Sequence, residues 1–142
     1  MRKVLAPFDG SASSLRAVQY LVDFSRSFGD LHVHLVNVQS EPRFYGNYVS
    51  PDMLEQLHAG ALDHAAELNA KAAALLQEAG IKYDTHEVMG EVVSEILNLC
   101  RQHHCDTIVM GTRGQSGLKN LVMGSVASHV VHGAEVPVLL VK

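Results

Sequence analysis

The stretch that decides the fold is DTIVMGTRGQSGLKNLVMGSVASHVV, residues 106–131. Its first residues, 106–111, form a short run rich in Ile, Val and Met, which indicates a buried strand. From Ser125 apolar residues recur at helical spacing until Gly133, so a helix is expected there. A glycine-rich loop that opens onto a helix either holds phosphate or simply turns the chain, and this stretch alone leaves both interpretations open.

Outward from this stretch, strands and helices alternate along the whole chain. Strand-like runs occupy 3–8, 31–38, 82–89, 106–111 and 136–142. The patterns between them predict helices that begin at Ser11 or Ser13, at Asp52, at Gly90 and at Ser125. The helix over 52–79 contains Gly60, which could interrupt it, and the connection at 39–52 is longer than usual.

The alternating order predicts an α/β fold, because parallel strands need helical crossovers that cover the sheet. We expect one open, five-stranded, mainly parallel sheet in the order 3-2-1-4-5, with helices on both faces, a Rossmann-like arrangement. Right-handed crossovers then place the reversal of winding between strands 1 and 4. We expect residues 1–142 to form a single domain, since 142 residues suit one core.

Composition excludes several classes of function. Hydrophobic residues make up 47% and charged residues 18%, as in globular proteins, and the net charge is -4. This acidic balance argues against binding to nucleic acid or to a membrane surface, which both favour basic proteins. No apolar run has the length of a membrane span or of a signal-peptide core, so we expect a cytoplasmic location.

The cysteines and histidines carry no recognised metal motif. Cys100 and Cys105 flank two histidines in CRQHHC, but their spacing differs from the CxxC pairs of structural zinc sites, which favours two reduced, buried thiols. Among the nine histidines, His32 and His34 share one face of a strand. The pair has no third ligand nearby in the sequence, so we expect histidines that lie at the surface or have hydrogen-bond partners.

The topology nevertheless predicts a binding site at the glycine loop. Ligands of open parallel sheets bind beyond the carboxyl ends of the strands, where the winding reverses. Residues 7–10 and 110–117 meet there. We expect the loop glycines to allow positive φ and close approach of N–H groups to phosphate, and Ser125 to cap the last helix. The loop is no Walker A motif, because no lysine precedes Ser125.

The loop also matches a family motif. GTRGQSGLKNLVMGS fits G-x2-G-x9-G-[ST], with Gly111, Gly114, Gly124 and Ser125 at the fixed positions. On this motif, and on APFDGS, VNV, GEVVSEIL and VPVLLVK elsewhere, the chain resembles the ATP-binding branch of the universal stress protein family over essentially its whole length.

The resemblance implies a bound adenine nucleotide and its contacts. Implied neighbours of the adenosine are Pro7, Asp9, the Val38 main chain, Met110 and Gly111, while the phosphates would lie at Gly114, Gly124, Ser125 and Val126. The residues themselves leave Asp9 open, as a ligand for ribose or Mg²⁺ or as a helix cap. Arg113 could reach phosphate or point into solvent.

The resemblance further implies a stress-response sensor or regulator that binds ATP, or AMP or ADP, with Mg²⁺ as a candidate companion. Two alternatives stay open: a slow ATPase, and a nucleotide-free dimeric interaction module. Family members usually pair through the last strand, and the apolar edge Val136–Val141 independently favours a homodimer.

Overall fold

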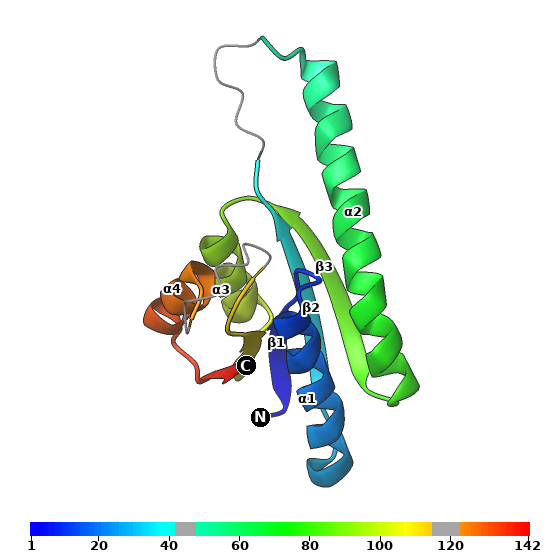
Figure 1. Cartoon of the computed structure of the whole chain (residues 1–142), viewed down its shortest axis with the longest axis vertical. Helices are drawn as coiled ribbons and strands as arrows, with labels where there is room; N and C mark the ends of the chain where they lie inside the picture. Colours follow the sequence, from blue (N-terminus) through cyan, green and yellow to red (C-terminus); the bar gives the residue numbers. More distant parts are fainter. Residues whose placement is uncertain (42–47, 115–122) are drawn as a thin grey trace.

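The computed structural model describes residues 1–41, 48–114 and 123–142. Their strands form one parallel sheet in the order β3-β2-β1-β4-β5, which confirms the predicted topology (Figure 1). The strands are β1 Lys3–Pro7, β2 His32–Gln39, β3 Lys82–Met89, β4 Thr107–Gly111 and β5 Val138–Val141. The helices are α1 Ala12–Phe28, α2 Pro51–Glu78, α3 Val92–Gln102 and α4 Ser125–Gly133.

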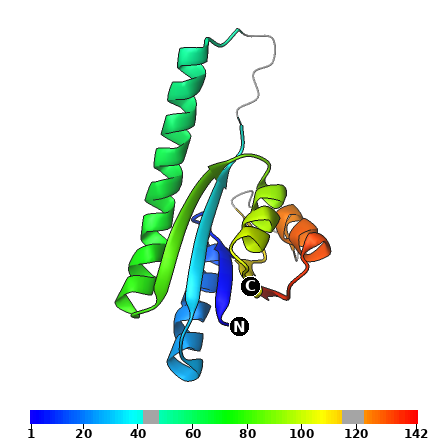
Figure 2. The ribbon, with the colours of Figure 1, turned by 180° about the vertical axis from the view of Figure 1, so that it is seen from behind.

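Helices cover both faces of the sheet. One core lies between the sheet and α1 and α2, and it buries Val4 and Ala6 of β1. The second core lies beneath α3 and α4, and it buries Leu5 of the same strand (Figures 1 and 2). Successive side chains of a strand point to opposite faces, so a nearly continuous apolar run such as β1 supplies both cores.

Helix α1 shows how the turn after β1 is built. Ser11 caps the helix, and its Oγ accepts a hydrogen bond from the Ser14 N–H at 3.2 Å. Asp9 is therefore not the helix cap; its Oδ1 accepts the Ser11 N–H at 2.9 Å. The helix ends at Gly29, whose φ of 85° is accessible to glycine and costly for other residues.

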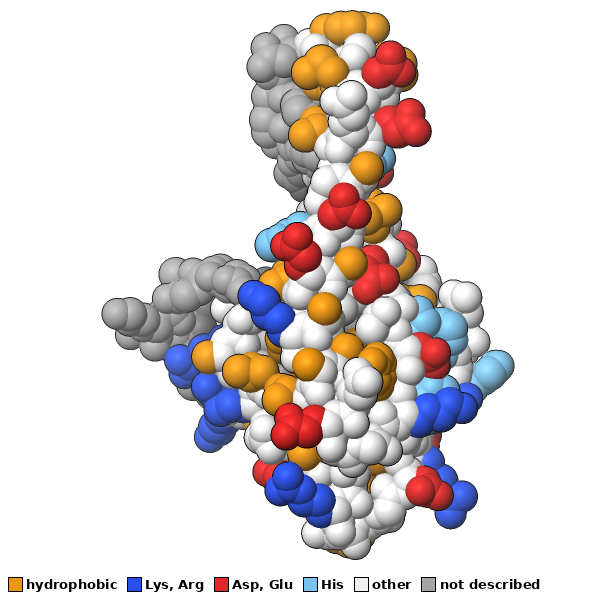
Figure 3. Space-filling view, turned by 90° about the vertical axis from the view of Figure 1, so that its right-hand side faces the viewer, with side chains coloured by type: hydrophobic (Ala, Val, Ile, Leu, Met, Phe, Trp, Pro, Cys, Tyr) orange, Lys and Arg blue, Asp and Glu red, His pale blue; other side chains and the backbone are white. Residues whose placement is uncertain are grey.

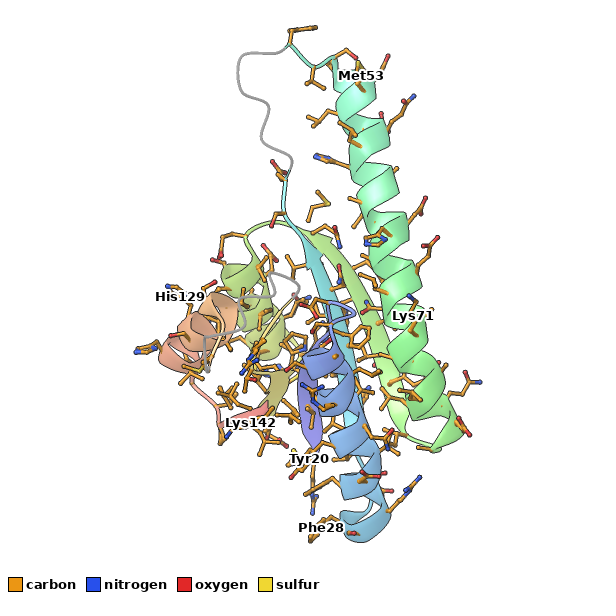
Figure 4. All side chains as sticks on the ribbon, in the orientation of Figure 1. Tyr20, Phe28, Met53, Lys71, His129 and Lys142 are labelled. Carbon is orange, nitrogen blue, oxygen red and sulfur yellow. The ribbon has the colours of Figure 1, made fainter. Side chains whose placement is uncertain are left out.

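Helix α2 runs without interruption through Gly60, so the helix is not broken at this possible break point. The residues it buries, Ala65, Asn69, Ala72, Ala73 and Leu76, belong to its second half. The first half projects beyond the sheet (Figures 1 and 2), and Met53 lies near its far end (Figure 4). Within the described ranges, no helix has both the length and the hydropathy that crossing a bilayer requires. Residues 42–47 of the expected loop 39–52 lie outside the described residues.

The winding of the sheet reverses between β1 and β4, as predicted. β1 pairs with β2 on one side and with β4 on the other. The segments that follow β1 and β4 consequently leave the sheet at the same edge. The Phe8 N–H extends the β1 pairing by donating to the Val36 carbonyl at 2.8 Å.

Candidate functional site

A pocket of about 410 Å³ lies at this reversal point. It is enclosed by the ends of β1, β2 and β4 and by the first turns of α3 and α4. Its volume falls within the range of small-molecule sites in proteins, roughly 300–1,000 Å³. The pocket is therefore large enough for a ligand of nucleotide size.

The lining residues are of two kinds. Apolar side chains contribute Val36, Val38, Val92, Ile96 and Met110. Polar groups and backbone contribute Asp9, Ser14, Asn37, the segment 111–114 and the start of α4 at 124–126. The remaining lining residues are Pro7, Phe8 and Ala127. A ligand with a flat apolar part and an anionic part matches this composition.

The start of α4 supplies donors for the anionic part. Gly124 is the N-cap residue, with φ −72° and ψ 164°, and no side chain of the described residues caps the helix there. Ser125 is the first helical residue, so the prediction that it caps α4 is wrong. The first N–H groups of a helix lack partners within the helix and lie at its positive end, which together make an anion-binding position.

Backbone pairing holds the start of α4 against the end of β4. The Gly124 N–H donates to the Thr112 carbonyl at 2.6 Å, and the Thr112 N–H donates to the Val141 carbonyl at 3.0 Å. These bonds fix the two glycine-containing segments relative to each other and to β5, although residues 115–122 between them lie outside the described residues. The geometry of the pocket rim is thus set by main-chain hydrogen bonds.

The motif glycines serve close approach, and the prediction that they adopt positive φ is wrong. In the described chain, the positive-φ glycines are Gly10, Gly29, Gly80 and Gly90. A Cβ at Gly111 would lie 2.4 Å from Ser13 Oγ, and one at Gly114 would lie 3.0 Å from Asp9 Oδ2. Gly111 at the end of β4 and Gly114 after it are therefore needed because residues that follow β1 pack directly on them.

Asp9 and Arg113 are the charged residues among the described residues that line the pocket. Asp9 is half-buried, and Arg113 is exposed. The Arg113 backbone joins the two sides of the rim, because its N–H donates to Ser13 Oγ at 3.4 Å and its carbonyl accepts from Ser11 Oγ at 3.4 Å. A carboxylate and a guanidinium thus border the same opening.

The structure brings all the sequence-predicted site residues into this pocket. They are Pro7, Asp9, Val38, Met110, Gly111, Arg113, Gly114, Gly124, Ser125 and Val126. Sequence reasoning missed Val92 and Ile96, whose spacing on α3 predicts a buried face without showing that the face ends at a pocket. It also missed Asn37, a buried amide inside β2 whose Nδ2 donates to the Phe8 carbonyl at 2.8 Å.

Cys100 and Cys105 lie away from the pocket as buried, unpaired thiols, in accord with the sequence-based expectation. Burial raises the pKa of both thiols, that of Cys105 to about 12. Both cysteines therefore remain protonated at neutral pH and behave as core residues.

The chain was compared with known protein families and with individual proteins. The Universal stress protein family matches residues 1–142. The chain is 31% identical over 141 residues to universal stress protein MJ0531 of Methanocaldococcus jannaschii, covering 99% of this chain and 82% of that protein.

Two solved structures are similar to this chain. Protein MJ0577 of the same organism superposes with a TM-score of 0.85 at 25% identity, over 99% of this chain and 95% of the other. A universal stress protein family member from Arabidopsis thaliana with AMP bound gives a TM-score of 0.73 at 21% identity, over 100% and 92%. With the family matched along its full length, the chain belongs to the universal stress protein family.

Proposed function

We propose that this protein binds an adenine nucleotide, namely ATP, AMP or ADP, in the pocket at the sheet reversal, and that it acts in the stress response as a sensor or regulator of nucleotide state. The observation that carries the proposal is the start of α4, which no described side chain caps and which faces a pocket whose other side is apolar. The motif Gly111, Gly114, Gly124, Ser125 and the AMP-bound Arabidopsis relative support the same ligand class.

The phosphates belong at the α4 end of the pocket. The N–H groups of Ser125, Val126 and Ala127 belong to the first turn, where helices leave donors unpaired. Charge-assisted hydrogen bonds from such donors to phosphate need no lysine. Arg113 at the rim adds a positive charge that can reach the outermost phosphate.

The adenosine belongs at the apolar end. The pocket is lined there by Val38 near the end of β2, by Met110 of β4 and by Val92 and Ile96 of α3. These side chains suit the flat faces of a purine, while the main chain at Val38 suits its polar edge. Pro7 and Gly111 also line the pocket, and the ribose is placed beside them.

Asp9 is proposed as the ligand for the ribose hydroxyls or for Mg²⁺ on the phosphates. Two results decide between these roles. If ATP affinity depends on Mg²⁺ and Asp9→Asn removes that dependence, Asp9 acts on the metal. If Asp9→Asn weakens ATP and adenosine binding equally with or without Mg²⁺, Asp9 holds the sugar.

The composition of the rim favours holding a nucleotide over hydrolysing it. Position 124, where a Walker A motif has its lysine, is occupied by Gly124. Turnover is measured directly by incubating the protein with ATP and Mg²⁺. Many turnovers within minutes that disappear in Asp9→Ala would replace the sensor proposal with an ATPase.

We further propose a homodimer through the last strand. β5 lies at one edge of the sheet, and Val138–Val141 remain half-buried although all are apolar. Pairing of two β5 strands would cover this edge and satisfy its free backbone groups. Sedimentation of the protein at micromolar concentration should show a dimer, and a Leu140→Lys variant should shift it to monomer; a monomeric parent protein would contradict the proposal.

The nucleotide proposal is tested with a matched pair of variants. Ser125→Glu places a carboxylate at the first turn of α4, where it repels phosphate but suits the helix dipole. Ser94→Glu makes the same change at an exposed serine in the first turn of α3, outside the pocket. By calorimetry, Ser125→Glu should weaken ATP binding at least tenfold and leave adenosine binding nearly unchanged, while Ser94→Glu should bind ATP like the parent.

The native ligand is identified by denaturing freshly purified protein and measuring the released compound by mass. An adenine nucleotide is expected. If no nucleotide is released and the parent protein shows no ATP binding by calorimetry, the protein is a nucleotide-free interaction module instead.

A further inference from the structure

A second group of side chains lies apart from the pocket. Histidines gather with an acidic side chain near one edge of the molecule (Figure 3). The residues of this histidine cluster are His32, His34, Asp84, His86 and His103. For His32 and His34 the sequence predicted histidines at the surface or with hydrogen-bond partners; His34 is buried, and its Nδ1 is hydrogen-bonded to His86 Nε2.

Strand register and the end of a helix bring the cluster together. In the parallel pairing of β2 with β3, His34 is paired with Asp84, and Val36 with His86. His34 and His86 therefore point to the same face of the sheet as Val36, toward α3. His103 is the residue at which α3 ends, and its N–H donates to the Leu99 carbonyl at 3.0 Å. Three distant segments thus contribute one imidazole each.

The rings of His34, His86 and His103 are close enough to share one ion. One ring nitrogen from each lies within 4.8 Å of those from the other two. His34 Nδ1 lies 3.0 Å from His86 Nε2, and the rings of His86 and His103 have centroids 4.4 Å apart. Tetrahedral Zn²⁺ with Zn–N bonds of about 2.1 Å needs nitrogens about 3.4 Å apart, so shifts of roughly 1 Å would complete the geometry.

The ring of His34 is buried at the centre of the cluster. The residue is only 4% exposed, and its Nε2 has no hydrogen-bond partner among the described residues. Buried polar atoms are nearly always paired because an unpaired one destabilises the fold. The nitrogen that faces His86 is Nδ1, so Nδ1 is the proposed ligand atom, and the unpaired Nε2 would carry the ring proton.

We propose that His34, His86 and His103 form a binding site for one divalent transition-metal ion of the imidazole-preferring class, such as Zn²⁺. His86 and His103 are half-buried, so water can occupy the fourth position. Asp84 accepts a hydrogen bond from His32 Nε2 at 2.5 Å and lies 3.9 Å from His34 Nδ1. The negative charge of Asp84 beside the rings favours binding of a divalent cation.

Burial and neighbouring rings lower the pKa of two of these histidines. Burial, helped by the neighbouring His32, His103 and His86, lowers the pKa of His34 to about 4. Burial and His103 also lower the pKa of His86.

The site would join α3 to β2 and β3. The other end of α3 contributes Val92 and Ile96 to the pocket described above. The metal site does not depend on the proposed nucleotide function, because it shares no lining residue with that pocket.

Metal binding is tested on the untagged full chain after removal of metal with EDTA. Titration with Co²⁺ should give the visible absorption bands of four-coordinate Co²⁺ at one equivalent, and Zn²⁺ should abolish them. His86→Gln and His103→Gln should each weaken Zn²⁺ binding at least tenfold; both positions are half-buried, so these variants avoid the core change that His34→Gln makes.

The matched control is the double variant His129→Gln, His132→Gln. Both histidines are exposed on α4, and each Nδ1 bonds to a carbonyl of its own helix. The control should bind Zn²⁺ like the parent protein. Absence of Co²⁺ bands in the parent, or Zn²⁺ affinity lost in the control and kept in the cluster variants, would overturn the proposal.

Discussion

Replacing Gly111 by alanine tests the packing that shapes the pocket. The added Cβ would lie 2.4 Å from Ser13 Oγ, 2.7 Å from the Ser13 carbonyl carbon and 2.8 Å from Ser13 Cβ. Carbon atoms in contact prefer separations of about 3.5–4.0 Å. Rotation of the Ser13 side chain can relieve only the first contact, because the carbonyl carbon belongs to the backbone of α1. The start of α1 must therefore move by roughly 1 Å from β4.

The expected cost follows from this forced movement. Overpacking of a well-packed core typically destabilises a protein by about 1–3 kcal/mol. The displacement also stretches the hydrogen bond from Ser13 Oγ to the Val141 carbonyl, now 3.2 Å. With a urea dependence of about 1–3 kcal/mol/M, the unfolding midpoint should fall by roughly 1 M.

Gly60→Ala is the matched control. Gly60 lies inside α2, and a Cβ there would meet no atom within 4 Å. The same substitution should stabilise the protein by about 0.5–1 kcal/mol, because alanine favours the helix. Urea unfolding followed by circular dichroism measures both. A Gly111→Ala midpoint equal to or above that of the parent would refute the close packing of β4 on α1.

Three further results are expected. Burial lowers the pKa of His34 from 6.5 to about 4, so the unfolded state binds more protons between these values. In metal-free protein, this one group should contribute about 2–3 kcal/mol to the loss of stability between pH 7 and pH 4.5. The measured loss should shrink by about that amount in His34→Gln, and an unchanged loss contradicts the prediction. Cys100 and Cys105 should react with a thiol reagent only after unfolding, whereas prompt reaction of folded protein argues against their burial. Asn37→Leu should lower stability by about 1–3 kcal/mol, because the buried Phe8 carbonyl loses its donor; equal stability would show that this hydrogen bond adds nothing.

The sequence was sufficient for the topology and for the position of the pocket. Alternating periodicities identify the strands and helices, and the crossover rules then leave few strand orders. Gly111, which ends β4, and Gly124, which comes after β4 in the chain, could be placed at the reversal point whatever their conformation. Their conformation itself could not be predicted, since glycine is required equally by positive φ and by a close neighbour such as Ser13.

Contacts between distant segments could not be predicted. The partnership of His34 with His86 depends on the β2–β3 register, and His103 joins them only because α3 ends there. Local rules also left competing caps: Ser11 caps α1 in place of Asp9, and Gly124 takes the cap position in place of Ser125. Such choices depend on tertiary contacts that a sequence pattern does not encode.

The most direct test of the nucleotide proposal is a titration of ¹⁵N-labelled protein with ATP, followed by amide chemical shifts. The amides of Ser125, Val126 and Ala127 should shift most strongly, together with those of residues 111–114, and adenosine should shift the Val38 and Met110 amides while leaving the start of α4 nearly unchanged. ATP-induced shifts that spare 124–127, or that lie only on other faces of the protein, would contradict the placement of the phosphates at α4.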